Sequence, residues 1–241
     1  QIQLVENAIA SKFDAIILSA ADSKALNPVI VKANEANIPV ILVNDTIDEE
    51  ALAADGGFVE TYVGIDQYEA ASLAGEYAAN NLDGGKILLL EGPSGVDALQ
   101  QRLDGFKDQV EGKEGFEIVS SQNANCDRNE GFGVMQNVMT SNPDVNIVWA
   151  VNAEMGQGAI QAIEQAGKTG TISVFDFDAS DDDIEAIKEG TLVGSVAQYP
   201  GLQAEGAIQA CLDVLSGKKL DPHTKTKAEL ITKDNVDTFG E

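Results

Sequence analysis

The stretch TISVFDFDASDDDIEAIKEGTLVGSVA, residues 171–197, predicts a strand, a helix and a second strand in direct succession. The two outer runs are short and rich in apolar and β-branched residues. Between them, Ser180 can cap a helix, and the carboxylates of Asp181–Asp183 face the positive end of its dipole. Gly190 lies where that helix should end. A strand–helix–strand unit of this kind is the repeating piece of a parallel sheet.

The same alternation continues in both directions along the chain. Short apolar runs are separated by segments of about 10–16 residues that have helical periodicity. Strands of nearly continuous apolar residues belong to parallel sheets with helices on both faces. We therefore expect an α/β protein with a doubly wound architecture. The predicted strands span 13–18, 39–43, 58–64, 86–90, 116–121, 146–151, 171–176 and 192–197.

The first residues, QIQLVENAIASK, predict a helix, whereas a doubly wound lobe usually begins with a strand. We expect that a βαβ unit of roughly 30 residues or more is missing before this helix. The opening residues also lack the basic and apolar regions of a signal peptide. No stretch approaches the roughly 20 apolar residues of a membrane helix, so we expect no direct insertion into a membrane.

Composition excludes several classes of function. Forty acidic residues against fifteen basic ones give a net charge of −25, which would repel a nucleic acid. The two cysteines, Cys126 and Cys211, and the one histidine, His223, form no metal motif. A histidine without a recognisable nucleophile beside it argues against covalent catalysis. We expect neither an enzyme nor a cofactor.

Polar residues follow most of the predicted strands, at the sheet edge where ligands of open α/β proteins bind. Amide and carboxylate side chains offer several hydrogen-bonding positions each, which suits a ligand with many hydroxyl groups. Trp149 lies inside an apolar run and is expected in the core. The polar set comprises Ser19 with Asp22, Asn44 with Asp45, Asn152 with Glu154, Phe177 with Asp178, and Gln198 with Tyr199.

Two other ligand classes fit the residues poorly. The segment EGPSG, residues 91–95, only faintly resembles a phosphate loop and has no basic residue. The run DFDASDDD, residues 176–183, lacks the spacing and the closing glutamate of a calcium loop. We expect Asp178 to hydrogen-bond a ligand, and we expect Asp181–Asp183 to be helix charges rather than metal ligands.

The chain resembles the periplasmic ribose-binding proteins and related sugar and polyol receptors of ABC importers. The resemblance spans the whole length and is spread over several stretches in the same order. These are ANEANIPVILVND (33–45), GVMQNVMTSNPDVNIVWAVNAEMGQGAIQAIEQAGK (133–168), VFDFDAS (174–180), GSVAQYP (194–200) and KAELITKDNV (227–236).

The resemblance implies a ligand site. The family's helical arginine corresponds to Arg102, and its strand-end asparagine corresponds to Asn152. The family's Phe-Asp pair corresponds to Phe177 and Asp178, and its hinge-side glutamine to Gln198. Ser19 stands where ribose receptors carry an asparagine.

Two segments depart from the ribose pattern. Asn44 and Asp45 stand where ribose receptors have an Asp-Arg pair, so an anion replaces a cation. Cys126 stands where those receptors stack a phenylalanine, with Arg128 two residues further on. Both changes alter the groups that can hydrogen-bond or stack, so the residues favour ribose no more than another monosaccharide or a linear polyol.

The resemblance also implies two lobes joined by a hinge of three strands, with crossings near 65–67, 198–200 and 225–228. One lobe would contain 1–65 plus 199–227, and the other 66–198 plus 228–241. The family's first strand and helix would be missing. The two cysteines would lie on opposite lobes and form no disulfide.

The expected partners are a small sugar or polyol, the permease subunits of an ABC importer, and as a further candidate a chemoreceptor. The protein would be a monomer located in the periplasm, or lipid-anchored outside a cell with a single membrane. Sugar binding in the cleft would close the lobes.

Two alternatives stay open at this point. The effector-binding core of a lac-repressor-type transcription factor shares the fold, but it would need a helix-turn-helix that these residues lack. A sugar hydrolase or kinase would need paired carboxylates or a phosphate loop, and we find neither set.

Overall fold

A computed structural model describes residues 1–240. The chain divides into two compact units, each built from more than one segment. The first unit comprises Gln1–Asp66, Ser94–Ala98 and Tyr199–Lys227, and the second comprises Gln67–Pro93, Leu99–Gln198 and Ala228–Glu241. The expected lobe boundaries had assigned 94–98 to the second lobe, whereas these residues belong to the first compact unit.

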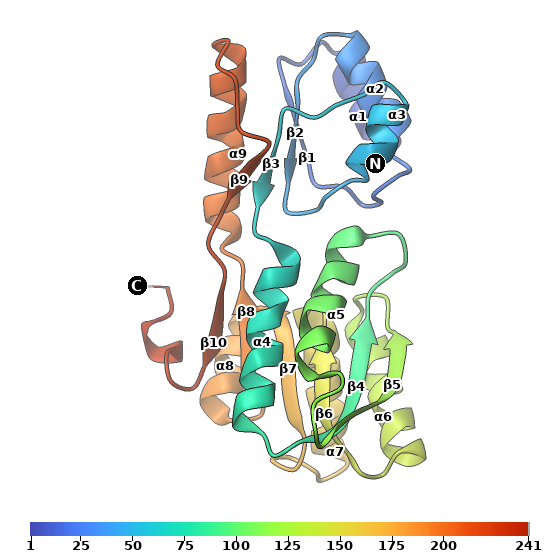
Figure 1. The fold of residues 1–241 in the computed structure, drawn as a ribbon, viewed down its shortest axis with the longest axis vertical. Helices are drawn as coiled ribbons and strands as arrows, with labels where there is room; N and C mark the ends of the chain where they lie inside the picture. Colours follow the sequence, from blue (N-terminus) through green and yellow to red (C-terminus); the bar gives the residue numbers. More distant parts are fainter. Residues whose placement is uncertain (241) are drawn as a thin grey trace. The chain divides into compact units, whose positions relative to one another are not determined.

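The first unit contains a parallel four-stranded sheet in the order β1-β2-β3-β9 (Figure 1). Its strands are β1 (Ile16–Leu18), β2 (Val40–Val43), β3 (Thr61–Gly64) and β9 (His223–Lys225). Its helices are α1 (Ile2–Ala10), α2 (Asn27–Glu35), α3 (Glu49–Ala54) and α9 (Pro200–Leu215).

Alternation along β2 supplies the core on both faces of this sheet. Val40 and Leu42 point to the face covered by α1, α2 and α3, where Ile30 and Leu52 are fully buried. Ile41 points to the other face, where it packs against α9 at Ala207 and Ala210.

The second unit contains a six-stranded sheet in the order β10-β8-β7-β6-β4-β5, in which only β10 runs antiparallel to its neighbour. Its strands are β4 (Gly85–Glu91), β5 (Phe116–Asn123), β6 (Val145–Ala150), β7 (Ser173–Asp178), β8 (Gly194–Ala197) and β10 (Glu229–Thr232). Its helices are α4 (Gln67–Asn81), α5 (Asp97–Val110, beginning in the first unit's segment), α6 (Arg128–Ser141), α7 (Ala153–Gln165), α8 (Asp181–Glu189) and the short η1 (Val236–Thr238).

Helices α4 and α5 lie in front of this sheet in Figure 1, and α7 and α8 lie behind it. On the α5 side, Trp149 of β6 is fully buried and stacks on Phe106 at 4.8 Å between ring centroids. This confirms Trp149 as a core residue. The doubly wound α/β class is likewise confirmed, because helices cover both faces of each sheet.

Helix α8, Asp181–Glu189, begins as the sequence predicts. The Ser180 hydroxyl accepts from the amide of Asp183, and the Asp183 carboxylate accepts from the amide of Ser180, which forms a capping box. Gly190 ends the helix at φ 83°, a conformation that glycine adopts without cost. All three carboxylates lie in the first turn as predicted, and Asp183 is fully buried, where its Oδ1 also accepts from Nε2 of Gln157 at 2.7 Å.

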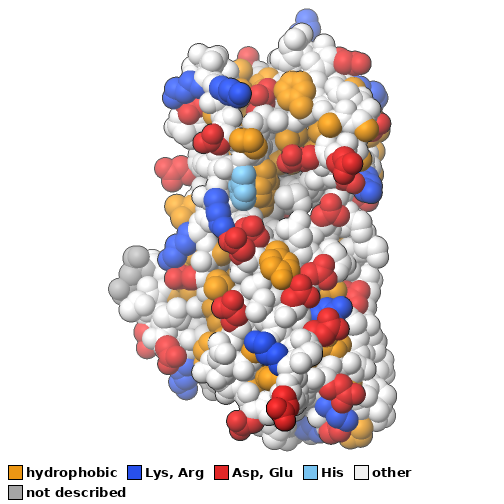
Figure 2. All heavy atoms as spheres, in the orientation of Figure 1, with side chains coloured by type: hydrophobic (Ala, Val, Ile, Leu, Met, Phe, Trp, Pro, Cys, Tyr) orange, Lys and Arg blue, Asp and Glu red, His pale blue; other side chains and the backbone are white. Residues whose placement is uncertain are grey.

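No helix among residues 1–240 is long and apolar enough to cross a membrane. Acidic side chains are scattered over the face drawn in Figure 2 and do not gather into one patch.

Candidate functional site

Arg102 of α5 is the centre of a polar cluster within the second unit. Its side chain is 4% exposed, and its guanidinium donates to Oε1 of Gln67 at 2.8 Å and to the carbonyl of Val151 at 3.1 Å. It also lies 3.5 Å from Oε1 of Gln198 and 3.5 Å from Oδ1 of Asp178. A buried guanidinium with this many acceptors is held in one orientation.

The ring of Phe177 packs against the guanidinium of Arg102. The guanidinium carbon lies 3.8 Å from the centre of the Phe177 ring, within the range of a cation–π contact. Because Phe177 is fully buried, its ring is covered by Arg102 and protein rather than open to a ligand. Phe177 therefore acts through Arg102.

Asp178 lies at the carboxyl end of β7, with about a third of its side chain exposed. Its Oδ1 accepts from Nε2 of Gln198 at 2.6 Å, and its Oδ2 accepts from the amide of Ala153 at 3.3 Å. Burial raises the pKa of this carboxyl group, and the charge of Arg102 opposes that rise. The backbone φ of 108° at Asp178 is unusual for a residue other than glycine.

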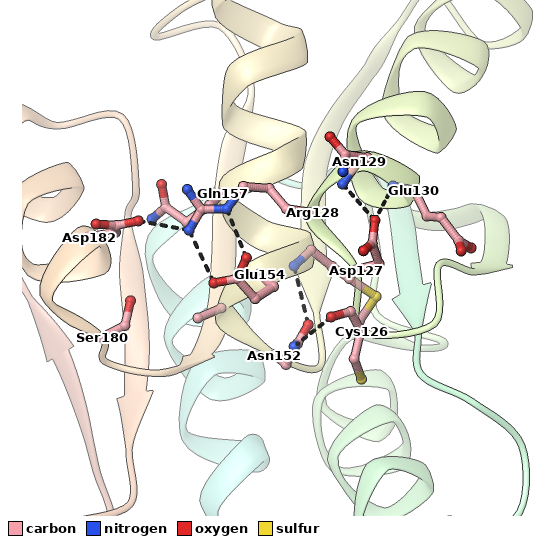
Figure 3. A network of polar contacts seen from close by, with 12 residues as sticks. Cys126, Asp127, Arg128, Asn129, Glu130, Asn152, Glu154, Gln157, Ser180 and Asp182 are labelled. Carbon is pink, nitrogen blue, oxygen red and sulfur yellow. Dashed lines mark hydrogen bonds and ion pairs between the residues drawn. The ribbon is translucent and has the colours of Figure 1, made fainter.

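Asn152 links this cluster to the segment that contains Cys126 (Figure 3). Its Oδ1 accepts from the amide of Met155 at 3.2 Å, so it caps α7. Its Nδ2 donates to the carbonyl of Cys126 at 3.5 Å, a long hydrogen bond. Asn125 and Cys126 both have positive φ, at 51° and 57°, so the chain turns tightly here.

Arg128 was predicted as a ligand residue, but its guanidinium is already engaged. It forms ion pairs with Glu154 at 2.9 Å and with Asp182 at 2.7 Å, and its side chain is 41% exposed. Figure 3 shows the side chain extending from α6 across α7 toward α8, on the far side of Asn152 from Cys126. These pairs raise the pKa of Arg128 above its usual range. The structure does not bring its guanidinium into the Arg102 cluster.

The first unit carries the remaining predicted residues. Ser19 follows β1, and Asn44 and Asp45 follow β2, so the three lie at neighbouring strand ends. The Ser19 hydroxyl and Nδ2 of Asn44 (at 3.2 Å) both donate to Oδ2 of Asp45. Asn44 has a φ of 63°, and the Asp45 amide donates to the carbonyl of Val43 at 2.7 Å, which turns the chain sharply there.

Residues near this trio perform structural roles that the sequence did not reveal. The Asp22 carboxylate accepts from the amides of Lys24 and Ala25, which lowers its pKa and holds the turn before α2. The Gln1 side chain donates to the carbonyl of Ser19 and accepts from the amide of Ala21. Both contacts fix the loop that presents Ser19.

The structure therefore assembles two sets of predicted residues, one in each unit. In the second unit, direct contacts join Arg102, Phe177, Asp178 and Gln198. Asp178 also accepts from the amide of Ala153, and the residue before it, Asn152, donates to the carbonyl of Cys126. In the first unit, Ser19, Asn44 and Asp45 form the other set. Sequence reasoning missed Gln67, because its contact with Arg102 joins two helices far apart in the sequence.

Both sets offer hydrogen-bond donors and acceptors held in place by the backbone. Among residues 1–240, no cluster of three or more His, Cys, Asp or Glu side chains could hold a metal ion. What the arrangement offers is recognition of polar groups such as hydroxyls.

Comparisons with known proteins agree with this chemistry. The sequence model of the periplasmic binding protein domain matches residues 1–219. A ribose import binding protein of Bacillus subtilis is 35% identical over 95% of this chain and 72% of its own length. A D-ribose/D-allose-binding protein of Pseudomonas aeruginosa is 35% identical over 96% of this chain and 74% of its own.

Solved structures give the same picture. A periplasmic solute-binding protein of an ABC transporter from Actinobacillus succinogenes, with bound D-allose, superposes with a TM-score of 0.94 and 32% identity. That match covers 99% of this chain and 85% of the other. A solute-binding protein from Bacillus halodurans, with bound myo-inositol, has a TM-score of 0.91 and 31% identity, over 99% and 81% of the two chains.

Proposed function

This chain belongs to the periplasmic binding protein domain family, and from that premise we propose that it captures a monosaccharide or a polyol and delivers it to an ABC importer. The relatives reported above are named for ribose, allose or inositol, and none of these names identifies the solute of this chain. We therefore propose a class of ligand and not a particular sugar.

The observation that carries the proposal is the buried Arg102 cluster. A guanidinium that is 4% exposed, with Phe177 beneath it and Asp178 and Gln198 beside it, fixes donors and acceptors before any ligand arrives. Pre-organised polar groups lower the entropic cost of binding a small polar solute. Asp178 keeps about a third of its side chain exposed, so it can accept from a ligand hydroxyl.

We further propose that the two compact units are the lobes of such a receptor. Apart from the short excursion of Ser94–Ala98 into the first unit, the chain passes between the units at Asp66/Gln67, Gln198/Tyr199 and Lys227/Ala228, which supports a hinge made of three connections. On this proposal the set around Arg102 and the set around Asp45 bind opposite sides of one ligand, and binding closes the lobes.

The proposed setting follows from the relatives, which are import binding proteins. We propose that the chain works outside the cytoplasmic membrane, in the periplasm or anchored by a lipid, and presents its loaded form to permease subunits. We propose a binding protein without turnover of the sugar. The named relatives favour this over a repressor core, the alternative that shares the fold.

The test is a thermal shift series with pentoses, hexoses and polyols, followed by calorimetry on those that respond. A solute that binds only the folded protein raises Tm by mass action, by an amount that grows with its concentration. We expect one or a few members to raise Tm clearly. A flat response across the whole panel would refute the proposal.

Two variants then locate the site. Asp178→Ala removes a carboxylate fixed by Gln198 and Ala153, and we expect it to weaken binding about tenfold or more. Ser19→Ala removes an exposed hydroxyl that already donates to Asp45, and a smaller loss is expected. Equal losses from the two variants would show that the ranking of these residues is wrong.

A further inference from the structure

Asp45 carries a carboxylate that no cation neutralises. Its Oδ2 accepts from the Ser19 hydroxyl and from the side-chain Nδ2 of Asn44. Its Oδ1 accepts no hydrogen bond from the described residues. No ion pair joins Asp45 to a lysine or an arginine within residues 1–240. Both of its partners are neutral donors, so the negative charge stays at the end of β2.

Two other carboxylates of the first unit, Asp48 and Asp22, differ from Asp45. Asp48 pairs with Lys24 at 3.0 Å, and Asp22 is held by two backbone amides. In the second unit the proposed ligand carboxylate, Asp178, lies 3.5 Å from the guanidinium of Arg102. The first unit contains no arginine, since both arginines of the chain, Arg102 and Arg128, belong to the second.

This difference has a physical consequence if both sets bind one ligand, as the proposed function requires. The Arg102–Asp178 pair contributes no net charge, whereas Asp45 contributes one negative charge. Enclosing that charge beside a neutral sugar costs free energy, because the carboxylate loses water without gaining a counter-ion. An ammonium group on the ligand would supply the counter-ion and a charge-assisted hydrogen bond.

We propose that Asp45 selects a polyhydroxylated amine, such as an amino sugar or an amino polyol, over its neutral counterpart. The inference rests on the proposed function, and it assigns to Asp45 the recognition of the ammonium group. Ser19 and Asn44 orient the carboxylate so that Oδ1 remains available to the ligand. The hydroxyl groups of the same ligand would be recognised by the set around Arg102.

The experiment compares matched pairs by calorimetry at neutral pH, using the whole chain. The pairs are D-glucose with D-glucosamine, D-galactose with D-galactosamine, and myo-inositol with an amino-inositol. N-acetylglucosamine serves as a probe in which the same nitrogen carries no charge. We expect at least one amine to bind about tenfold or more tightly than its neutral partner.

Asp45→Asn keeps the shape of the side chain and removes its charge. We expect the amine preference to fall to near unity in this variant, because the amine loses the charge-assisted hydrogen bond and its neutral partner has none to lose. Asp14→Asn is the matched control, because it removes one exposed negative charge at the opposite end of β1. The amine preference should survive in that control.

The possible outcomes separate this inference from the proposed function. If neutral and amine partners bind equally, the inference is wrong and the proposed sugar receptor stands. If an amine is preferred but Asp45→Asn keeps that preference, Asp45 is not the selecting residue. If no member of the panel binds, both the proposed function and the inference fail.

Discussion

Asp176 lies wholly inside the second unit, on β7 beneath helix α7. Neither of its carboxyl oxygens has a hydrogen-bond partner of normal geometry, and its side chain is fully buried. Burial and the nearby charge of Asp183 raise its pKa well above the usual range. Asp178 adds to the same effect, while the Ser195 hydroxyl opposes it. At this residue the fold favours the neutral carboxylic acid.

The raised pKa of Asp176 predicts a pH dependence of stability. Its contribution is fully present below the unfolded pKa of about 4 and is lost as pH rises through the higher folded pKa. Asp176→Asn is always neutral, so we expect it to be more stable than the natural chain at pH 8, by about 1 kcal/mol or more. The difference should shrink toward pH 5.

Urea unfolding at several pH values measures this effect, with Asp221→Asn as a control for the loss of one exposed charge. The control should leave the pH dependence unchanged. A variant Asp176→Asn that is less stable than the natural chain at every pH would contradict the reasoning. It would mean that the carboxylate has a partner that the amide cannot replace.

At the scale of the element, helices α6 and α7 pack closely through glycines. A Cβ atom at Gly158 would come within 2.1 Å of the carbonyl oxygen of Arg128, which is backbone and cannot move aside easily. Gly133, on α6 itself, has open space around its Cα. Gly158 therefore permits the close packing of α6 on α7, whereas no described residue packs closely against Gly133.

This contrast predicts opposite effects of the same substitution. Gly158→Ala should push α6 away from α7 and lower the free energy of unfolding by about 1–3 kcal/mol. Gly133→Ala should leave it unchanged or raise it by about 0.5–1 kcal/mol, because alanine has the better helix propensity. Denaturant unfolding of both variants checks the pair, and similar effects at the two positions would disprove the packing argument.

The central elements could be predicted from sequence because their apolar runs are specific. Runs such as 86–90 and 146–151 lie within strands β4 (85–91) and β6 (145–150) to within one residue. Strand β9, His223–Lys225, could not be found this way, since all three residues are exposed. Its pairing with β3 depends on backbone hydrogen bonds, which leave no pattern in the side chains.

The candidate site shows the same division between local and long-range information. The residues at strand ends follow from the rule that ligands bind beyond the carboxyl ends of a parallel sheet. The engagement of Arg128 with Glu154 and Asp182 depends on how three helices pack, so it could not be read from spacing. The same holds for Ser94–Ala98, which joins the first unit through the contact of Ser23 with Gly95.

At the scale of the whole molecule, the two units carry separate sheets, and the chain passes between them five times, because Ser94–Ala98 makes a short excursion from the second unit into the first. The proposed function requires the two units to close on a bound ligand. The natural cysteines lie one in each unit, Cys211 in the first and Cys126 in the second, and neither forms a disulfide. Because Cys126 belongs to the proposed site, spin labels that report closure should be attached at other positions.

Spin labels at Asp14→Cys in the first unit and Glu114→Cys in the second, with both natural cysteines replaced by serine, report the distance between the units. Both positions are exposed. If binding selects a closed arrangement, the distance distribution should shift and narrow at saturating ligand. Asp178→Ala at the same ligand concentration should respond less, because fewer molecules are loaded. A distribution that stays unchanged while calorimetry reports saturation would show that the solute binds without closing the units, and presentation to a permease would then need another signal.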